Sequence, residues 1–216
     1  MYEAGAWKMI ARVMSHEIIN VTTPIVSISR SLLGRDDVKG TPLEAGIAAI
    51  SSSSQRMCDL IVSYRKISNI EKPQLEDIPL RPIIESVFML YPGLVIETQA
   101  LPDVTVRADA SMLKHVFINI VNNAVEAGAK RLFVSLDSAR HSSRSMVIYV
   151  GNDGQPIADE DRQSLFFPSF TTKPSGNGIG LALSKRMMVI QGGKLELADK
   201  HPAGCQVGFL LTIPLS

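Results

Sequence analysis

The segment Gly176-Asn177-Gly178-Ile179-Gly180-Leu181 has a glycine at every second position and leads directly into an amphipathic stretch that ends at Ile190. Glycines let a backbone approach phosphate oxygens closely, and the first turn of a helix directs free N–H groups at them. Glycine-rich turns are common, so this segment alone is weak evidence. Three further motifs precede it in the chain, and a histidine lies far upstream of all of them. Together they predict a phosphate-binding loop.

Two asparagines four residues apart lie in a predicted helix over residues 109–127. Asn119 and Asn123 therefore share one face of that helix. Mg²⁺ takes oxygen ligands and usually bridges nucleotide phosphates, so side-chain amide oxygens suit it. A pair of surface asparagines with a mild helix-propensity cost is the plain alternative. The adjacent Asn122 points about 100° away from Asn123.

A predicted strand ends in Asn152-Asp153-Gly154. An amide or carboxylate oxygen there could accept a hydrogen bond from an adenine amino group, while Gly154 would let the backbone approach the ring; an ordinary turn is the alternative. The aromatic segment 166–170 follows, and core packing is its default interpretation. Its place just before the glycine-rich segment suggests the anchor of a mobile lid, from which Lys173 would reach the phosphates.

His16 lies on a long predicted helix whose apolar residues recur at steps of three and four. It is two residues from both Met14 and Ile18 on that stripe, which predicts that its ring points into solvent. A neutral imidazole can attack phosphorus, and Glu17 could take the proton from the other ring nitrogen. Asn20, one turn further on, could position a water. An unreactive surface histidine is the alternative.

The first seventy residues read as two amphipathic helices joined by a turn at Gly34–Pro42. Each helix carries a heptad-like apolar stripe, formed by Trp7, Ile10, Met14, Ile18, Val21, Ile25, Ile28 and Leu32 on the first and by Leu43, Ile47, Ile50, Met57, Ile61 and Tyr64 on the second. This face is too large for one hairpin to hide, which predicts a dimeric four-helix bundle. Pro24 is expected to kink the first helix.

A polar segment with two prolines, residues 71–79, reads as a linker. Beyond it, residues 80–216 alternate between helices and strands that are mostly joined as hairpins. The predicted helices are 81–90, 109–127 and 180–191, and the predicted strands are 94–98, 131–136, 145–150, 194–198 and 207–213. Such a mixture predicts a two-layer α/β sandwich.

Bulk composition narrows the classes of function. The chain has 216 residues, 45% hydrophobic and 20% charged, with a formal net charge of +1, which gives no argument for binding nucleic acid or an anionic membrane. Two cysteines without ligand-like spacing predict free thiols in a reducing, cytoplasmic setting. No apolar run approaches the roughly 18 residues of a membrane span, although a longer, membrane-anchored parent could tether this chain to the inner membrane.

The ordered motifs resemble the kinase core of a two-component sensor histidine kinase. The likeness is carried by His16-Glu17-Ile18-Ile19-Asn20 (H-box), Asn119–Asn123 (N-box), Asn152–Ile157 (first glycine box), Phe166–Lys173 (F-box) and Gly176–Leu181 (second glycine box). Five motifs in a fixed order are far more specific than any one of them. The H-box and the following Thr22-Thr23-Pro24-Ile25 are most similar to nitrogen-regulation-type sensors.

The resemblance implies a hairpin for dimerisation and histidine phosphotransfer over residues 1–70 and a GHKL (Bergerat) ATP-binding fold over residues 80–216. It implies phosphoryl transfer from MgATP to His16, with Glu17 as the base, and onward transfer to an aspartate of a response-regulator receiver domain. Asn20, in a Glu-x-x-Asn arrangement, implies an additional phosphatase activity toward that regulator. The binding set it implies is Asn119 and Asn123 for Mg²⁺, Asn152, Asp153 and Gly154 for adenine, and Lys173, Gly176, Gly178, Gly180 and Leu181 for the phosphates.

Three positions depart from the family pattern. Val21 stands where the H-box usually has proline, Asn152 where the first glycine box usually has aspartate, and Pro156 where that box has its second glycine. An amide oxygen accepts a hydrogen bond without the charge assistance of a carboxylate. Two alternatives follow: a histidine phosphotransfer scaffold with a weakened ATP site, and an ATPase of the same superfamily that drives conformational change or phosphorylates a serine.

Overall fold

The computed structural model describes residues 2–99, 103–137, 139–140, 142–173 and 178–215; the side chains of residues 2–17, 63 and 66 lie outside this description. The chain divides into two compact units. One comprises Met1–Ile70 with Thr171–Ile179, and the other comprises Glu71–Phe170 with Gly180–Ser216. In the described part of the chain, no helix has both the length and the apolar character needed to span a membrane.

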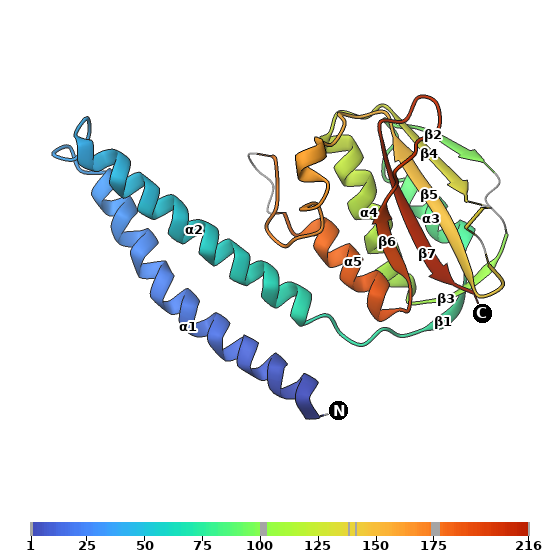
Figure 1. The fold of residues 1–216 in the computed structure, drawn as a ribbon, viewed down its shortest axis with the longest axis horizontal. Coiled ribbons are helices and arrows are strands. Elements are labelled where there is room, and N and C mark those ends of the chain that lie inside the picture. Colours follow the sequence, from blue (N-terminus) through green and yellow to red (C-terminus); the bar gives the residue numbers. More distant parts are fainter. Residues whose placement is uncertain (1, 100–102, 138, 141, 174–177, 216) are drawn as a thin grey trace. The chain divides into compact units, whose positions relative to one another are not determined.

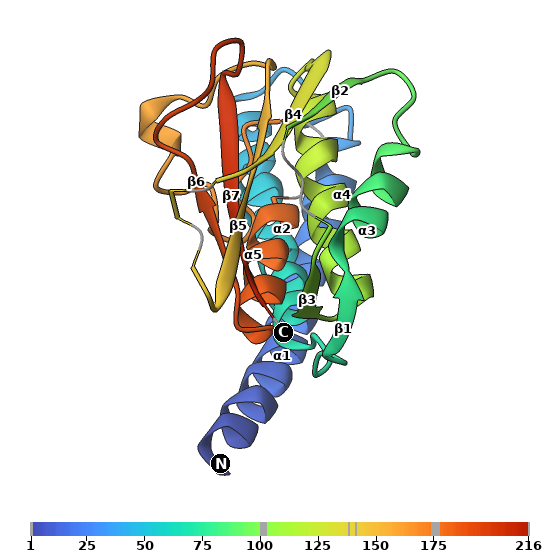
Figure 2. The same cartoon turned by 90° about the vertical axis from the view of Figure 1, so that its right-hand side faces the viewer.

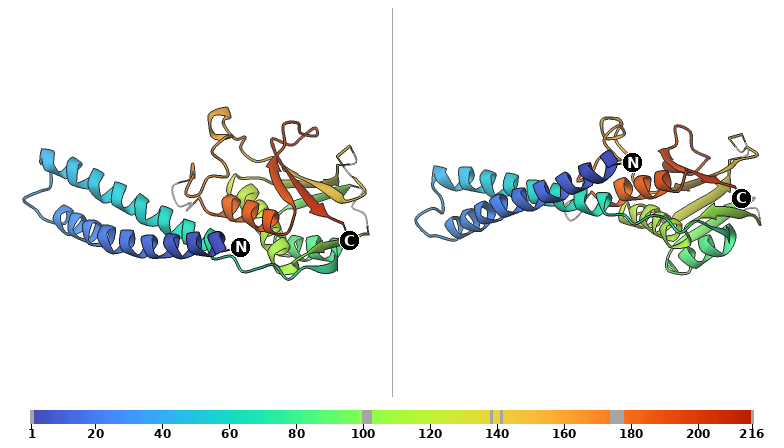
Figure 3. Two further views of the ribbon diagram at one scale, coloured as in Figure 1. Left: turned by 60° about the horizontal axis from the view of Figure 1, so that its bottom comes forward. Right: turned by 90° about the horizontal axis from the view of Figure 1, so that it is seen from below.

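The N-terminal unit is built on a helical hairpin, as the sequence predicts. Helices α1 (Tyr2–Leu33) and α2 (Pro42–Ser68) lie side by side and antiparallel (Figures 1 and 3). Helix α2 begins with Pro42, at a position where a missing N–H leaves no hydrogen bond unmade. Helix α1 continues through Pro24 as one element.

The seam between α1 and α2 combines apolar and hydroxyl-bearing side chains, and Val26 and Ile61 are among the buried residues of the hairpin. Thr22 and Ser29 are buried there. Thr22 Oγ1 donates to the carbonyl oxygen of Ile18 at 2.7 Å and lies 3.0 Å from Cys58 Sγ on α2.

Much of the predicted apolar stripe is exposed on the surface of the hairpin, although Ile61 is buried. Val21, Ile28 and Leu43 are 65%, 61% and 66% exposed, and Ile50 and Met57 are about half exposed. One hairpin therefore does not hide its own apolar face, in agreement with the sequence-based expectation.

The second unit is a two-layer α/β sandwich. Its main sheet has the order β2-β4-β5-β7-β6, with β2 (Val95–Gln99), β4 (Arg131–Leu136), β5 (Ser145–Asn152), β7 (Val207–Pro214) and β6 (Lys194–Leu197). Only the β2–β4 pair is parallel; the other neighbours are antiparallel. Helices α3 (Leu80–Phe88), α4 (Ala110–Glu126) and α5 (Gly180–Ile190) form the second layer (Figure 2). These elements match the predicted ones to within one or two residues at most ends.

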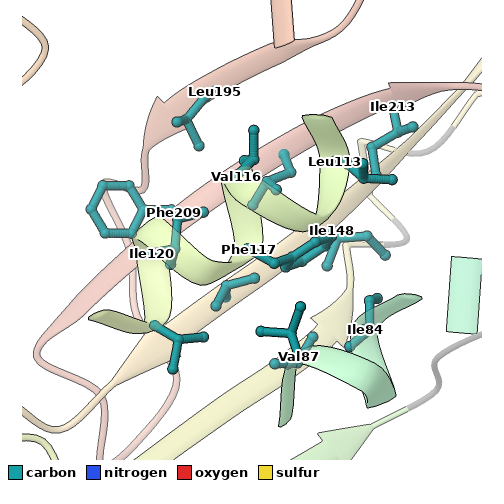
Figure 4. Close-up of a cluster of buried hydrophobic side chains, with 14 of the residues drawn as sticks. Ile84, Val87, Leu113, Val116, Phe117, Ile120, Ile148, Leu195, Phe209 and Ile213 are labelled. Atoms are coloured by element: carbon teal, nitrogen blue, oxygen red, sulfur yellow. The ribbon is translucent and has the colours of Figure 1, made fainter. Parts of the chain in front are cut away.

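The main core lies between these helices and the sheet (Figure 4). Phe117 and Ile120 of α4 are fully buried against Ile148 of β5 and Leu211 of β7. Alternate residues of β5 and β7 face this core, as expected for strands with a side-chain period of two. The remaining residues face the opposite side of the sheet, where Val147, Tyr149 and Leu210 form a smaller buried cluster.

A second, two-stranded sheet corrects the predicted linker. Strand β1 (Glu76–Pro79) pairs antiparallel with β3 (Thr105–Ala108), and neither strand was expected from the sequence. The linker assignment is therefore wrong for residues 76–79. Acidic residues and proline have low strand propensity, and Ile78 is the one buried residue of β1, so pairing with β3 decides the conformation.

Helix α4, which carries the candidate asparagines, is fixed at its start by Asp109. Its Oδ1 accepts hydrogen bonds from the backbone N–H groups of Ser111 and Met112, and its Oδ2 accepts one from Gln74 N–H. Gln191 Oε1 accepts from the Asp109 N–H at 2.7 Å. Burial by itself would raise the pKa of Asp109, but the N–H groups of Met112, Gln74 and Ser111 outweigh it and the net shift is downward.

We expect Asp109→Ala to lower the free energy of unfolding by about 1 kcal/mol, the usual cost of losing an N-cap. Because the folded-state pKa lies below the unfolded value, the carboxylate's contribution is complete above the unfolded pKa and is lost as pH falls through the folded pKa. Urea denaturation at several pH values would measure both effects. Asp109→Asn, which keeps a capping oxygen, should stay within about 0.5 kcal/mol of the wild type at neutral pH. Equal losses in the two variants would contradict the capping role.

Candidate functional site

Asn119 is held in place by the first turn of α5. Its Nδ2 donates to Ser184 Oγ at 2.9 Å and to the carbonyl oxygen of Gly180 at 3.3 Å. A carbonyl can only accept, so the amide nitrogen must face Gly180 and the amide oxygen faces the other way. Asn119 and Asn123 are both half-buried on the same side of α4. An amide oxygen fixed in this manner fits a Mg²⁺ ligand.

Ser184 is a site residue that the sequence analysis missed. It is fully buried in α5 and lies one turn after Gly180. Its position in an amphipathic helix does not mark it as a site residue in the sequence. A buried serine can be identified as one only when the structure shows which group its hydroxyl contacts. Here that group belongs to Asn119, so Ser184 connects the N-box helix to the helix that follows the glycine-rich loop.

Asn152 and Gly154 meet the end of α4. The side chain of Asn152 is 3% exposed, and its Oδ1 accepts from the Gly154 N–H at 3.0 Å. Gln155 N–H donates to the carbonyl oxygen of Ala127, the residue that ends α4, at 2.9 Å. A Cβ on Gly154 would lie 2.9 Å from Asn152 Oδ1 and 3.0 Å from that same carbonyl oxygen. The first glycine box and the N-box helix are thus brought together, and only glycine fits between them.

The Asp153 carboxylate holds the start of β4, and its expected role in adenine binding stays a prediction. Its Oδ1 accepts from the backbone N–H groups of Lys130 and Arg131 at 2.8 and 2.9 Å, at the start of β4. The Arg131 N–H is the main reason that the pKa of Asp153 lies below its ordinary value. Asn152, not its neighbour, is therefore the polar group that this turn keeps beside α4.

The glycine-rich segment is described in part. Gly178 has φ of 59°, in the left-handed region that glycine adopts without strain, and Gly180 begins α5. Leu181 packs against the main core. Gly176 lies outside the described residues. Lys173 N–H donates to Thr171 Oγ1 at 3.1 Å, and the expectation that its ammonium group reaches phosphates stays a prediction.

The aromatic segment is divided between core and surface. Phe166 packs against the main core, and Lys185 Nζ of α5 lies 4.7 Å from the centre of its ring. This cation–π contact joins the segment to α5. Phe167 is 63% exposed, so it is not the core aromatic of the default interpretation. Ser169 adopts a positive φ of 64°, which is uncommon for a residue with a side chain.

The candidate phosphoacceptor lies on α1. His16 and Glu17 belong to the helix, but their side chains fall outside the described ones, so the outward direction of the imidazole stays a prediction. Asn20, one turn further along, is exposed. Among the described residues, no cluster of three or more histidine, cysteine or acidic side chains could hold a metal ion.

The sequence of the sandwich shows which protein family the chain belongs to. The chain belongs to the family of histidine kinase-, DNA gyrase B- and HSP90-like ATPases, whose model matches residues 108–216. The catalytic domain of the histidine kinase ThkA matches 65% of this chain and 95% of its own length, with a TM-score of 0.57 and 26% identity. A structure of ThkA in complex with the response regulator protein TrrA matches 96% of this chain and 61% of that chain, with a TM-score of 0.57 and 25% identity.

Two curated relatives extend the likeness to the hairpin. The nitrogen regulation protein NtrY of Azorhizobium caulinodans is 27% identical over 97% of this chain. The sensor histidine kinase GlrK of Escherichia coli is 29% identical over 95% of it. The chain spans 29% of the length of the first relative and 46% of the second. The resemblance to the kinase core of a two-component sensor is therefore confirmed.

We expect Gly154→Ala to lower the free energy of unfolding by about 1–3 kcal/mol, because the new methyl group would overlap Asn152 Oδ1 and the Ala127 carbonyl. Urea denaturation followed by circular dichroism would measure the change. Gly93→Ala is the matched control: no atom lies within 4 Å of its added Cβ, and we expect a change within about 0.5 kcal/mol. Equal stability of the two variants would contradict the close packing described for Gly154.

Proposed function

We propose that this chain is an ATP-dependent protein-histidine kinase core, which phosphorylates His16 and passes the phosphoryl group to an aspartate of a response-regulator receiver domain. The proposal rests above all on Asn119, whose amide nitrogen is tied to Ser184 and Gly180 so that its oxygen remains for a ligand. Membership of the ATPase family and the likeness to sensor kinases over 95% or more of the chain support it.

Residues within 108–216, the range that matches the ATPase family, would bind the nucleotide. Asn152 would accept a hydrogen bond from the adenine amino group through its remaining Oδ1 lone pair, since Gly154 N–H already occupies the other. Asn119 and Asn123 would hold Mg²⁺ by their amide oxygens, and the ion would neutralise charge on the phosphates. Gly178, Gly180, Leu181 and Lys173 would surround the phosphates, with the N-terminus of α5 facing them.

Transfer to the hairpin is a displacement at the terminal phosphorus. A nitrogen of His16 would form the P–N bond while the bond from phosphorus to the bridging oxygen of ADP breaks. Glu17 would accept the proton from the other ring nitrogen. In the second step the P–N bond would break as a carboxylate of the regulator takes the phosphoryl group. Asn20, which is exposed, would orient a water that attacks the phosphorus of the regulator's aspartyl phosphate, releasing inorganic phosphate and the free carboxylate in the additional phosphatase reaction.

The exposed apolar stripe supports a homodimer. Val21, Ile28 and Leu43 together present large apolar side chains to solvent, which monomeric proteins avoid as a continuous surface. Pairing two hairpins through this stripe would bury it in a four-helix bundle. An apolar core would then form between the two copies.

Incubation with γ-phosphate-labelled ATP and Mg²⁺ tests the kinase reaction. We expect acid-labile, base-stable label, as a phosphoramidate gives. The label should be lost in His16→Ala, because the phosphoryl group would then have no acceptor. His115→Ala, on the exposed side of α4, should label as the wild type does. Asn123→Ala should label at least about 100-fold more slowly, since outer-shell changes at metal sites already cost about 10–100-fold. Label on serine, or undiminished label in His16→Ala, would favour the related ATPase; absence of label with intact phosphotransfer would favour the scaffold.

Light scattering tests the dimer. We expect the wild type to have the mass of two chains and Ile28→Glu to have the mass of one, because a buried unpaired carboxylate is costly in an apolar core. Met89→Glu is the control, since Met89 is 80% exposed at the end of α3, in the other unit. A dimer in both variants would show that the stripe is not the interface.

A further inference from the structure

The face of the main sheet that the helices leave uncovered has an unusual feature, a pair of glycines facing each other in mid-sheet. Gly151 of β5 and Gly208 of β7 are register partners, and both are buried. Glycine weakens a strand interior and often marks a place where another group approaches closely. The next residue pair along the ladder is Asn152 with Val207.

Tyr149 is the group that approaches. A Cβ added to Gly151 would lie 2.5 Å from the Tyr149 hydroxyl oxygen, and one added to Gly208 would lie 2.4 Å from it. The Tyr149 ring therefore packs across the backbone of both glycines and does not project away from the sheet. Phe133 of β4 packs against it edge to face, with ring centres 6.2 Å apart. Tyr149 is 6% exposed, so this position is well covered.

The connection between β6 and β7 covers Tyr149. His201 Nδ1 lies 3.3 Å from the Tyr149 hydroxyl oxygen, and Cys205 packs in the same small cluster. Burial raises the pKa of Tyr149, and Cys205 adds to the shift, so the hydroxyl group stays protonated and can donate. Burial lowers the pKa of His201, which favours a neutral ring with a nitrogen free to accept.

The last residue of the same connection is hydrogen-bonded to Asn152. Gln206 N–H, one residue after Cys205, donates to the backbone carbonyl oxygen of Asn152 at 2.7 Å. Asn152 is thus linked to Tyr149 in two ways. Along β5, the Tyr149 ring lies against Gly151, the residue immediately before Asn152. Across the sheet, the Tyr149 hydroxyl group contacts His201, in the same connection whose Gln206 N–H donates to the Asn152 carbonyl oxygen.

We infer that Tyr149 is a positioning residue for base recognition: its ring, lying across the Gly151–Gly208 pair, fixes the end of β5 and with it the direction of the Asn152 amide. The inference rests on the proposed function, in which Asn152 accepts a hydrogen bond from the adenine amino group. Tyr149 itself lies on the opposite face of the sheet from the main core and touches no nucleotide. Its effect should therefore appear in the choice between bases and not in the binding of phosphates.

Equilibrium binding of MgATP and of magnesium inosine triphosphate tests this, because inosine has a carbonyl group where adenine has its amino group. We expect the wild type to prefer ATP, and Asn152→Ala to lose the preference. Tyr149→Ala and Gly208→Ala should each reduce the ratio of the two dissociation constants by about tenfold, the size of one net hydrogen bond. Tyr149→Phe, which keeps the ring, should keep the ratio within about twofold of the wild type.

Two further variants separate positioning from general destabilisation. Val147→Ala removes a buried side chain from the same strand and the same small cluster, but two residues further from Gly151; it should lower stability and leave the ratio unchanged. Tyr149→Ala combined with Gly208→Ala should match Tyr149→Ala alone, because the added methyl group then meets no ring. An unchanged ratio in Tyr149→Ala and Gly208→Ala would overturn the inference while the proposed function stands. A wild type that binds neither nucleotide would overturn both.

Discussion

The carbonyl group of Ala127 is the point on which the nucleotide motifs of this chain converge. It ends α4, the helix that carries both asparagines, and it accepts the Gln155 N–H. Gly154 fits between it and Asn152 with no space for a side chain. The separation between the metal-ligand candidates and the base-reading candidate is therefore set by one backbone contact. Burial of Phe117 and Ile120 against the sheet keeps α4 at the distance that this contact requires.

The two units solve the problem of apolar surface in different ways. The sandwich covers one face of its sheet with three helices and buries a continuous core. The hairpin buries Val26 and Ile61 together with Thr22 and Ser29, and it leaves Val21 and Ile28 on the surface. The proposed homodimer would bury these exposed side chains in a four-helix bundle.

Periodicity carried most of the fold prediction, because α4, β4 and β7 have strong, regular apolar patterns that packing only reinforces. Strand β1 escaped notice since its pairing with β3 is a tertiary effect on a sequence of low strand propensity. Candidate site residues that lie in a motif, such as Asn119 and Asn152, can be proposed from the sequence, and their roles stay predictions. Ser184 and Tyr149 could not be proposed, because only the structure shows which groups they contact; the backbone N–H groups that Asp153 accepts from were likewise not foreseeable from the sequence.

The connection from β6 to β7 joins neighbouring antiparallel strands, and in most proteins such a segment varies freely in length from one relative to another. Here the segment is held at two points: His201 contacts the Tyr149 hydroxyl group, and Gln206 N–H donates to the backbone carbonyl oxygen of Asn152, the candidate base-reading residue. Under the proposed function, an insertion or deletion in this connection would change the preference between bases without replacing any of the candidate nucleotide-binding residues.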